Sequence, residues 1–259
     1  MCFDGYQPIS QFIRQVQTYV TGQRSESEET LKARIERAYG EKACRLAFEW
    51  LTDKRLYELT INLSLDNIFR ILETNRIMNA YESEKTSADQ NSFCPESPYY
   101  HQRRTIEDRF FGLVNTIPDK LRPRYAAVNW MLHPAGAAPI YGLNYLILKS
   151  RLIEEATFCA GDVYHNNDCN ALFIWQLLPY KIIEKFGSIL FNQIIRSYQT
   201  ARTTTEDYIE AHIFRTLTLS DVAKIRIHSS DKQRLQLKQM RWLRSLTQIY
   251  SINLEFFDW

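Results

Sequence analysis

The chain has 259 residues, 45% hydrophobic and 24% charged, which suits one large globular domain with an ordinary core. Its net charge of +2 gives no global sign of nucleic-acid or membrane binding. The low counts of glycine (8) and proline (8) argue against a loop-rich sandwich and against a glycine-rich nucleotide fold.

The cysteines and the N-terminus indicate a reducing environment and no membrane segment. The 5 cysteines lack CxxC spacing, so we expect free thiols. Cys159, His165 and Cys169 are close in sequence but fit no standard zinc spacing, and we predict packing and no metal. No signal peptide is visible, and no run of about 18 apolar residues occurs. The sequence therefore predicts a cytoplasmic protein, or one delivered from a bacterium into another cell.

The first 55 residues are predicted to be a helical N-terminal extension. Apolar residues recur at helical spacing over 8–21, where Pro8 suits the first turn and Gly22 a stop. A second stripe runs from the Ser27 region to about residue 51, and Gly40 can split it. Packing over one face of the core, a lid and a docking surface all remain open as roles.

An α+β domain is predicted over 56–259. Residues 57–63 alternate as a strand, Ser64 or Asp66 caps a short helix, and 77–81 return to extended structure. A long polar loop is expected over 83–100. A short helix follows over 105–113. Strands at 122–130 and 141–148, separated by a turn at 134–139, are predicted to pair as a hairpin.

The C-terminal part is predicted to alternate between helices and strands. Two helices are expected within 170–198, the first ending near Pro179. A β-pair follows, formed by the segment around Glu210 and by 216–227. An amphipathic helix over 233–249 and a last strand from residue 252 complete the chain.

Four motifs resemble a mostly bacterial domain family of unknown function. The family patterns are RPxYGAL, PRFG…LVLK, TTFxxxDS and DDYIEAQ…GPLxLxxDV. The corresponding stretches here are 122–128 (RPRYAAV), 139–149 (PIYGLNYLILK), 156–162 (ATFCAGD) and 206–222. The resemblance spans about 57–230. The chain departs from the family at residues 81–84, where the glycines and Asn of a FETGxSNG turn are missing, and at 59–64, where two histidines are missing.

A second resemblance is to the ADP-ribosyltransferases. A strand, a short helix (67–75, NIFRILETN), another strand and a late Glu in a β-segment follow the order of elements in that family. The resemblance implies an ADP-ribosyltransferase-like split β core, with NAD as substrate and a late acid as the catalytic group.

Glu210 is the residue expected to carry that chemistry. Transfer of ADP-ribose passes through an oxocarbenium-like ribosyl cation, which a carboxylate on a strand can stabilise. His212 shares a strand face with Glu210 and could form an acid/base pair with it. The residues expected to bind the cofactor are Arg122 and then Arg104 for the pyrophosphate, Tyr125 or Tyr141 for the nicotinamide, and Asp162 and Glu82.

Each of these residues also has a structural alternative. Glu210 could pair with Arg122 or Arg124 to stabilise the sheet. Asp162 could be a turn residue, and Glu82 could be a partner of the arginines. The tyrosines and His212 could be packing residues. The basic cluster of 103–124 could be a solvated face rather than an anion site.

The sequence therefore predicts an NAD-dependent ADP-ribosyltransferase, which modifies a macromolecular acceptor expected to be a protein. A role as a bacterial effector or toxin stays open. Two other readings stay open: a non-catalytic protein-interaction module and an NAD or nucleoside hydrolase. Neither a membrane nor a nucleic-acid partner is indicated.

Overall fold

A mixed sheet runs through the middle of the protein in the computed structural model, which describes residues 9–23, 26–53, 58–82, 97–113, 117–164, 171–196 and 208–258. Its eight described strands lie in the order β5-β4-β6-β2-β1-β3-β7-β8, and all neighbours are antiparallel except β7 and β8. The strands are β1 (Glu58–Leu63), β2 (Arg124–Asn129), β3 (Asn144–Leu148), β4 (Thr157–Cys159), β5 (Leu172–Ile174), β6 (Glu210–Ile213), β7 (Val222–His228) and β8 (Asn253–Phe257).

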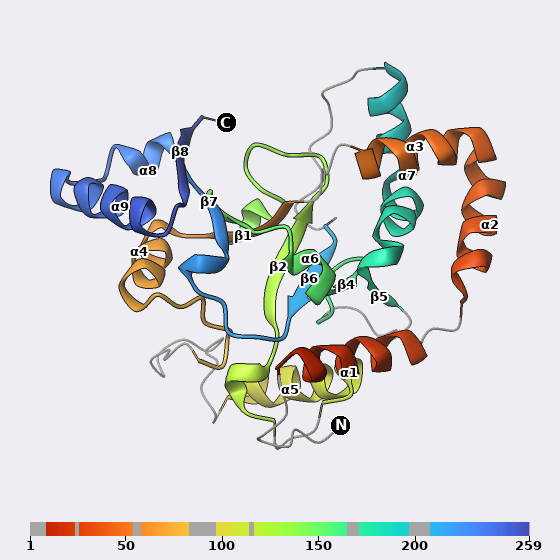
Figure 1. The fold of residues 1–259 in the computed structure, drawn as a ribbon, viewed down its shortest axis with the longest axis horizontal. Helices are drawn as coiled ribbons and strands as arrows, with labels where there is room; N and C mark the ends of the chain where they lie inside the picture. Colours follow the sequence, from red (N-terminus) through yellow and green to blue (C-terminus); the bar gives the residue numbers. More distant parts are fainter. Residues whose placement is uncertain are drawn as a thin grey trace.

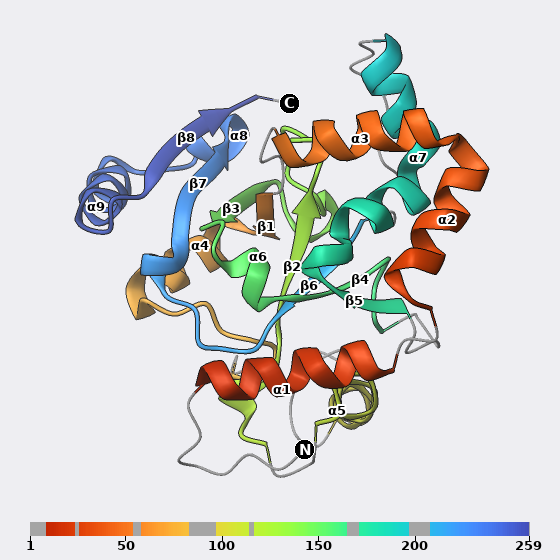
Figure 2. The same ribbon diagram turned by 45° about the vertical axis from the view of Figure 1, so that its right-hand side comes forward.

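Helices surround this sheet on three sides (Figures 1 and 2). Helix α1 lies beside α5 below the sheet, α2 and α3 pack on α7 at one end, and α4, α8 and α9 lie at the other. Their bounds are α1 (Ile9–Gly22), α2 (Glu28–Tyr39), α3 (Glu41–Asp53), α4 (Leu65–Thr74), α5 (Pro98–Phe111), α6 (Leu152–Glu155), α7 (Leu178–Arg196), α8 (Ser229–Lys232) and α9 (Leu237–Ile249). The predicted α+β class is confirmed.

Capping residues explain where several helices begin and end. The side chains of Ser27 and Ser64 accept hydrogen bonds at the starts of α2 and α4, as such residues do at N-caps. Gly40, with φ of 86°, separates α2 from α3. Ser97 caps α5 and Pro98 occupies its first turn, so this helix begins seven residues before the predicted position of residue 105.

The strand neighbours differ from the predicted pairs. Strand β1 lies between β2 and β3, so the predicted 122–130/141–148 hairpin is wrong. The segments around Glu210 and at 216–227 do not pair either, because β6 lies between β2 and β4 whereas β7 lies between β3 and β8. Both errors come from assuming that strands adjacent in sequence are neighbours in the sheet.

Two predicted elements also change type. Residues 172–174 form the strand β5, so the predicted helix around 172–178 is wrong. A single helix, α7, runs from Leu178 to Arg196. The strand expected at 77–81 is reduced to a single bridge between Ile77 and Leu217. Residues 83–96 of the predicted loop lie outside the described residues. Its last four residues, 97–100, are not loop but form the N-cap and first turn of α5.

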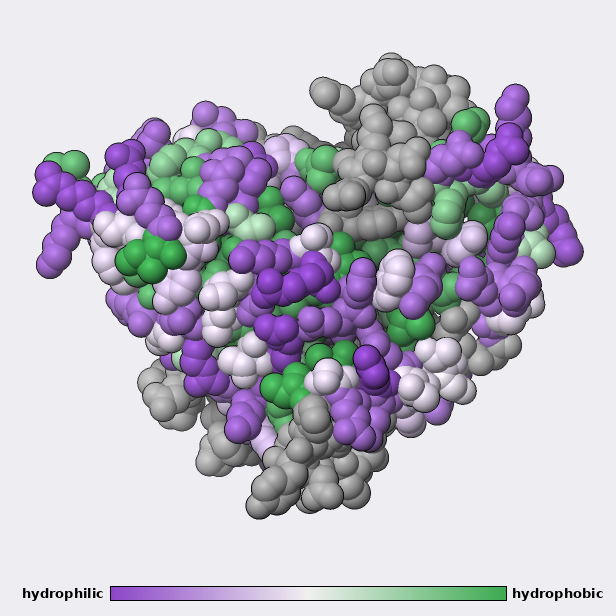
Figure 3. All heavy atoms as spheres, viewed as in Figure 1, coloured by the Kyte–Doolittle hydropathy of each residue, from purple (hydrophilic) through white to green (hydrophobic). Residues whose placement is uncertain are grey.

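Two apolar clusters fill the layers on the two sides of the sheet. The larger one joins α2, α3, α4 and α7 to the strands, and the smaller one joins α1 and α5 to Phe214 and its neighbours. Hydrophilic side chains cover most of the face in Figure 3, with separate hydrophobic areas between them. In the described residues, no helix is both long enough and apolar enough to cross a membrane.

Candidate active site

A pocket of about 400 Å³ opens over the centre of the sheet. Strands β1, β2 and β6 form its floor, and α5 and the segment around the short 3-10 helix η2 (Pro139–Tyr141) form its walls. The side chains that give this lining its chemical character are Arg103, Tyr125, Tyr141, Asp162, Tyr208 and Glu210.

Strand register brings the polar side chains to one face of the sheet. Glu210 lies opposite Ala127 of β2 and Cys159 of β4, and His212 lies opposite Tyr125 and Thr157. Because side chains alternate along a strand, Tyr208, Glu210 and His212 point to the same side. The predicted common face of Glu210 and His212 is therefore confirmed, and their side chains are in contact at 2.8 Å.

Glu210 has unequal carboxylate oxygens. Its Oε1 accepts a hydrogen bond from the backbone N–H of Val163 at 3.3 Å and is the atom that contacts His212. Among the described residues, Oε2 has no hydrogen-bond partner. The side chain is 5% exposed, so Glu210 is a nearly buried acid at the floor of the pocket.

His212 lies behind Glu210. It is fully buried and is not part of the pocket lining. Its Nε2 faces Glu210, and its Nδ1 lies 3.2 Å from the hydroxyl of Thr157. The rings of Phe111 and Tyr125 enclose it, with ring centroids at 4.8 and 5.5 Å.

Arg103 is the arginine of the pocket, and the sequence did not single it out for this position. Its guanidinium carbon lies 4.2 Å from the centre of the Tyr125 ring, a stacking geometry that leaves the planar edges of the group for polar partners. Burial lowers the pKa of Arg103, and the nearby Tyr125, Glu107, Glu210 and Asp162 raise it by more, so that its pKa is well above the ordinary value.

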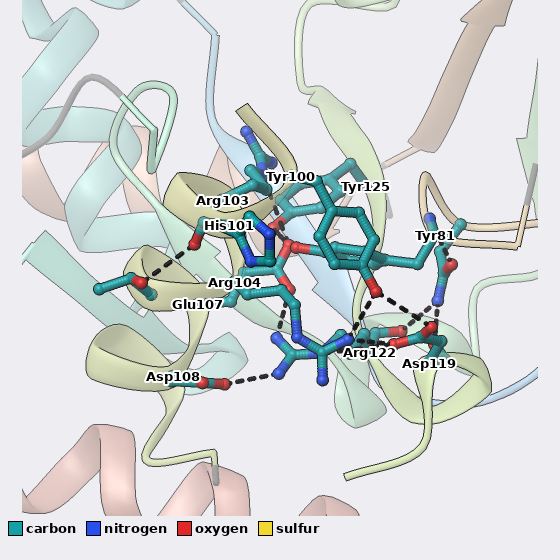
Figure 4. A network of polar contacts seen from close by, with 12 residues as sticks. Tyr81, Tyr100, His101, Arg103, Arg104, Glu107, Asp108, Asp119, Arg122 and Tyr125 are labelled. Atoms are coloured by element: carbon teal, nitrogen blue, oxygen red, sulfur yellow. Dashed lines mark hydrogen bonds and ion pairs between the residues drawn. The ribbon is translucent and has the colours of Figure 1, made fainter. Parts of the chain in front are cut away.

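A buried network holds Tyr125 and Arg103 in place (Figure 4). The Tyr125 hydroxyl donates to Glu107 Oε1 at 2.6 Å, and the Nε–H of Arg103 donates to the same oxygen at 3.4 Å. Arg122 donates to Glu107 Oε2 at 3.1 Å and to Asp108 at 2.7 Å. Burial raises the pKa of the Glu107 carboxyl, and the arginines and Tyr125 oppose this effect.

Several expected binding residues lie outside the pocket lining. Arg122 is completely buried and paired with Glu107 and Asp108. Arg104 binds Asp119 at 2.5 Å, and Glu82 pairs with Arg124 and Arg76. These residues belong to ion pairs because burial makes isolated charges costly. The solvated-face reading of the basic cluster is thus wrong for the buried arginines 103, 122 and 124.

Four expected residues do line the pocket together: Glu210, Tyr125, Tyr141 and Asp162. Asp162 also accepts a hydrogen bond from the backbone N–H of Tyr164, so its predicted turn role is present as well. The Tyr141 hydroxyl lies 3.3 Å from that of Tyr208 at the rim. Burial raises the pKa of both hydroxyls, which keeps them protonated and able to donate.

A sequence signal for Arg103 existed in the cap of α5. Ser97 followed by Pro98 is a typical helix start, and it places Tyr99 and Arg103 one turn apart on the same face. Both residues line the pocket. Starting the helix at residue 105 concealed this pair.

The positions of the missing family histidines also line the pocket. Thr60 and Asn62 of β1 occupy them, and their side chains bind the backbone on both sides of η2. Asn62 donates to the carbonyl oxygens of Ala135 and Gly142 at 2.7 and 3.0 Å. Thr60 Oγ1 accepts from the backbone N–H of Ala137 at 3.1 Å. These two side chains therefore shape the pocket wall.

A second pocket of about 250 Å³ continues from the first. The two share Ile61, Leu63, Asn67 and Ala80, and the second adds Arg70 and Arg76 at its edge. Arg70 and Arg76 are exposed, and Arg76 pairs with Glu82. Together the pockets form an elongated site. Its first part holds Glu210, Asp162, the tyrosines and Arg103, and its second part holds Arg70 and Arg76.

Comparison with known families agrees with the family resemblance. Residues 96–173 match a family described as "Protein of unknown function (DUF3626)". This range contains three of the four motifs and ends before Glu210. The expected resemblance to a domain family of unknown function is confirmed. No curated protein matches the chain.

Two solved structures of DarT from Thermus sp. 2.9 resemble the fold distantly. One is in complex with ADP-ribosylated single-stranded DNA; it has a TM-score of 0.39 and 10% identity, and the match covers 78% of this chain and 95% of that one. The other is in complex with NAD+; it has a TM-score of 0.38 and 10% identity, with coverage of 77% and 94%.

Proposed function

We propose that this protein is an ADP-ribosyltransferase that cleaves NAD in the pocket above Glu210. The observation that carries the proposal is the Glu210 carboxylate. One of its oxygens is fixed by protein donors, and the other has no described partner, on the floor of a pocket lined by tyrosines and an arginine. A carboxylate held on a strand is well placed to stabilise a ribosyl cation.

The reaction breaks the bond between the ribose C1′ and the nicotinamide nitrogen. The bonding electrons leave with nicotinamide and neutralise its ring, while positive charge develops on the ribose. Glu210 Oε2 is assigned to a ribose hydroxyl, where its negative charge stabilises that cation. A nucleophilic atom of the acceptor then bonds to C1′ and releases its proton.

The remaining lining fits the other parts of NAD. A pyridinium ring is cationic and aromatic, and Tyr141 and Tyr208 provide aromatic rings in the pocket lining for it, whereas the ring of Tyr125 is covered by Arg103. Arg103 supplies a planar donor for a pyrophosphate oxygen, a role expected for Arg122 from the sequence. The second pocket, with Arg70 and Arg76 at its edge, provides space for the adenosine end.

The test is NAD cleavage measured in two ways. Nicotinamide release is followed by chromatography, and transfer is followed with NAD labelled in its adenylate phosphate, added with lysate proteins or with single-stranded DNA. We expect the wild type to release nicotinamide and label an acceptor. Glu210→Gln is expected to lose about 100- to 1,000-fold in rate, because it removes the charge that stabilises the cation.

Glu154→Gln is the matched control, because Glu154 is an exposed acid on α6 outside the pocket. It should keep the wild-type rate. Nicotinamide release without labelling of protein or DNA would indicate an NAD hydrolase. The absence of both nicotinamide release and labelling would contradict the proposal and favour a non-catalytic interaction module.

A further inference from the structure

The groups behind Glu210 form a continuous chain of polar contacts. Thr157 Oγ1 lies 3.2 Å from His212 Nδ1, and His212 Nε2 lies 2.8 Å from Glu210 Oε1. The three residues stand on neighbouring strands β4 and β6, where Thr157 is directly opposite His212. Sheet register therefore sets this chain of contacts, rather than a mobile loop.

The chemistry of the ring decides which way the hydrogen bonds run. A neutral imidazole has one N–H donor and one acceptor nitrogen. An ionised Glu210 can only accept, so His212 must carry its proton on Nε2. The Thr157 hydroxyl then donates to Nδ1 and makes this the favoured tautomer. Both ring nitrogens of His212 then have a hydrogen-bond partner, as expected for buried polar groups.

Burial gives this arrangement its strength. Thr157 and His212 both have an exposed fraction of 0%. Phe111 of α5 and Tyr125 of β2 close the remaining sides of the imidazole, and Glu210 is the ionisable acid in contact with it. In such surroundings a hydrogen bond is stronger than in water, and the loss of one partner leaves an unpaired polar group.

We infer that His212 and Thr157 are positioning residues, which lock Glu210 Oε1 so that Oε2 is presented to the substrate. His212 has no surface in the pocket and therefore acts through Glu210, not as an acid or base on the substrate. The inference rests on the proposed function, because it assigns a purpose to the orientation of the proposed catalytic carboxylate.

Two variants of Thr157 separate orientation from packing. Thr157→Val keeps the shape and removes the hydroxyl, so Nδ1 loses its donor. Thr157→Ser keeps the hydroxyl and loses a methyl group. A third variant, His212→Gln, replaces the ring by an amide whose N–H can reach Glu210.

The first measurement is ¹⁵N NMR of histidine-labelled protein, with the His212 signals identified by their loss in His212→Gln. We expect the Nε2–H tautomer in the wild type and in both Thr157 variants. In Thr157→Val the Nδ1 signal should move downfield, because this nitrogen has lost its hydrogen-bond donor, whereas in Thr157→Ser it should stay near the wild-type position. The Nδ1–H tautomer in the wild type, or a Thr157→Val spectrum equal to that of the wild type, would overturn the inference.

The second measurement is the rate of nicotinamide release at varied NAD concentration. Thr157→Val should lower kcat by about 10- to 100-fold with little change in KM, because a misplaced carboxylate weakens the transition state more than binding. Thr157→Ser and His212→Gln should retain most of kcat. Equal rates in all variants, or a loss in Thr157→Ser as large as in Thr157→Val, would refute positioning.

The two measurements also separate the inference from the proposed function. A wild type that does not cleave NAD refutes the proposed function, and the tautomer spectra then still decide whether the Thr157–His212–Glu210 chain exists. If the wild type cleaves NAD but His212 is the Nδ1–H tautomer, the inference is refuted and the proposed function is not. Thermal unfolding of each variant confirms that the compared proteins are folded.

Discussion

At the scale of single residues, the buried acids Glu107 and Glu210 have opposite environments. Glu107 is enclosed by Arg103, Arg122 and Tyr125, so its charge is compensated within the protein. Glu210 has no arginine among its described ion pairs and keeps one oxygen without a described partner. The alternative in which Glu210 pairs with Arg122 or Arg124 is wrong, since these arginines bind Glu107, Asp108 and Glu82. This contrast is what makes Glu210 available for a substrate.

Tyr125→Phe tests the support of Arg103. The change removes the hydroxyl that donates to Glu107 and keeps the ring beneath the guanidinium. We expect unfolding free energy to fall by about 1–3 kcal/mol, because a fully buried carboxylate loses a donor. The KM for NAD should rise as Arg103 loses its fixed position.

The same variant should show a pH dependence with a defined sign. Burial raises the pKa of Glu107, and losing the Tyr125 donor raises it further. When the pKa of a carboxyl is higher in the folded than in the unfolded protein, its contribution to stability is complete at pH values below the unfolded-state pKa. This contribution is lost as the pH rises through the folded-state pKa. The loss of unfolding free energy in Tyr125→Phe relative to the wild type, measured by urea unfolding, should therefore be larger at about pH 8 than at about pH 5. In a Glu107→Gln background the deficit should not vary with pH; an equal dependence there would contradict this account.

At the scale of elements, the segment from β2 to β3 builds one wall of the pocket. It is held to β1 by Asn62, and it turns at Gly142, where φ is 149°. A Cβ atom at Gly142 would lie 2.3 Å from the backbone carbon of Leu63, so only glycine fits this turn. Tyr141, at the rim of the pocket, directly precedes it.

Gly142→Ala tests this wall. We expect a loss of at least about 1–3 kcal/mol in unfolding free energy, because the backbone conformation is strained for any other residue and the new atom meets the backbone of β1. Displacement of Tyr141 should also weaken NAD binding, measured by calorimetry. Gly22→Ala at the end of α1 has open space around it and should change stability by less than about 1 kcal/mol. Equal stability of the two variants would contradict the prediction.

At the scale of the whole molecule, the N-terminal helices share the core of the domain that carries the pocket. Leu31, Ile35 and Leu51 belong to the large apolar cluster. Phe12 of α1 packs edge-on against Phe214, just after β6, with ring centroids 6.4 Å apart. Among the roles left open for residues 1–55, the described contacts support packing, and α1 covers the layer behind the proposed catalytic strand.

Phe12→Ala tests whether α1 supports the site. Phe12 is completely buried, so we expect a loss of about 3–5 kcal/mol in unfolding free energy. The rate of NAD cleavage should fall as well, because β6 loses part of its support. Ile9→Ala, at a residue that is 45% exposed on the same helix, serves as the control and should have a small effect. Equal effects of the two variants would show that α1 is an independent appendage.

The sequence by itself determined most helices and the central strands, and it selected Glu210 as a candidate, which the structure places in the pocket lining. Capping residues, helical spacing and strand alternation depend only on residues close in sequence. The starts of α2 and α4 and the common face of Glu210 and His212 could therefore be predicted without the structure. The short strand β5 escaped because three residues are too few for a period.

Only the tertiary structure decided which residues meet. The insertion of β1 between β2 and β3 brings Thr60 and Asn62 beside Tyr125 and Glu210, and no local pattern encodes that neighbour relation. It also buried Arg122 with Glu107 and left Arg103 facing the pocket. The physical reason is that sheet order and charge pairing depend on contacts between distant parts of the chain, whose free energy is settled by the packing of the whole core.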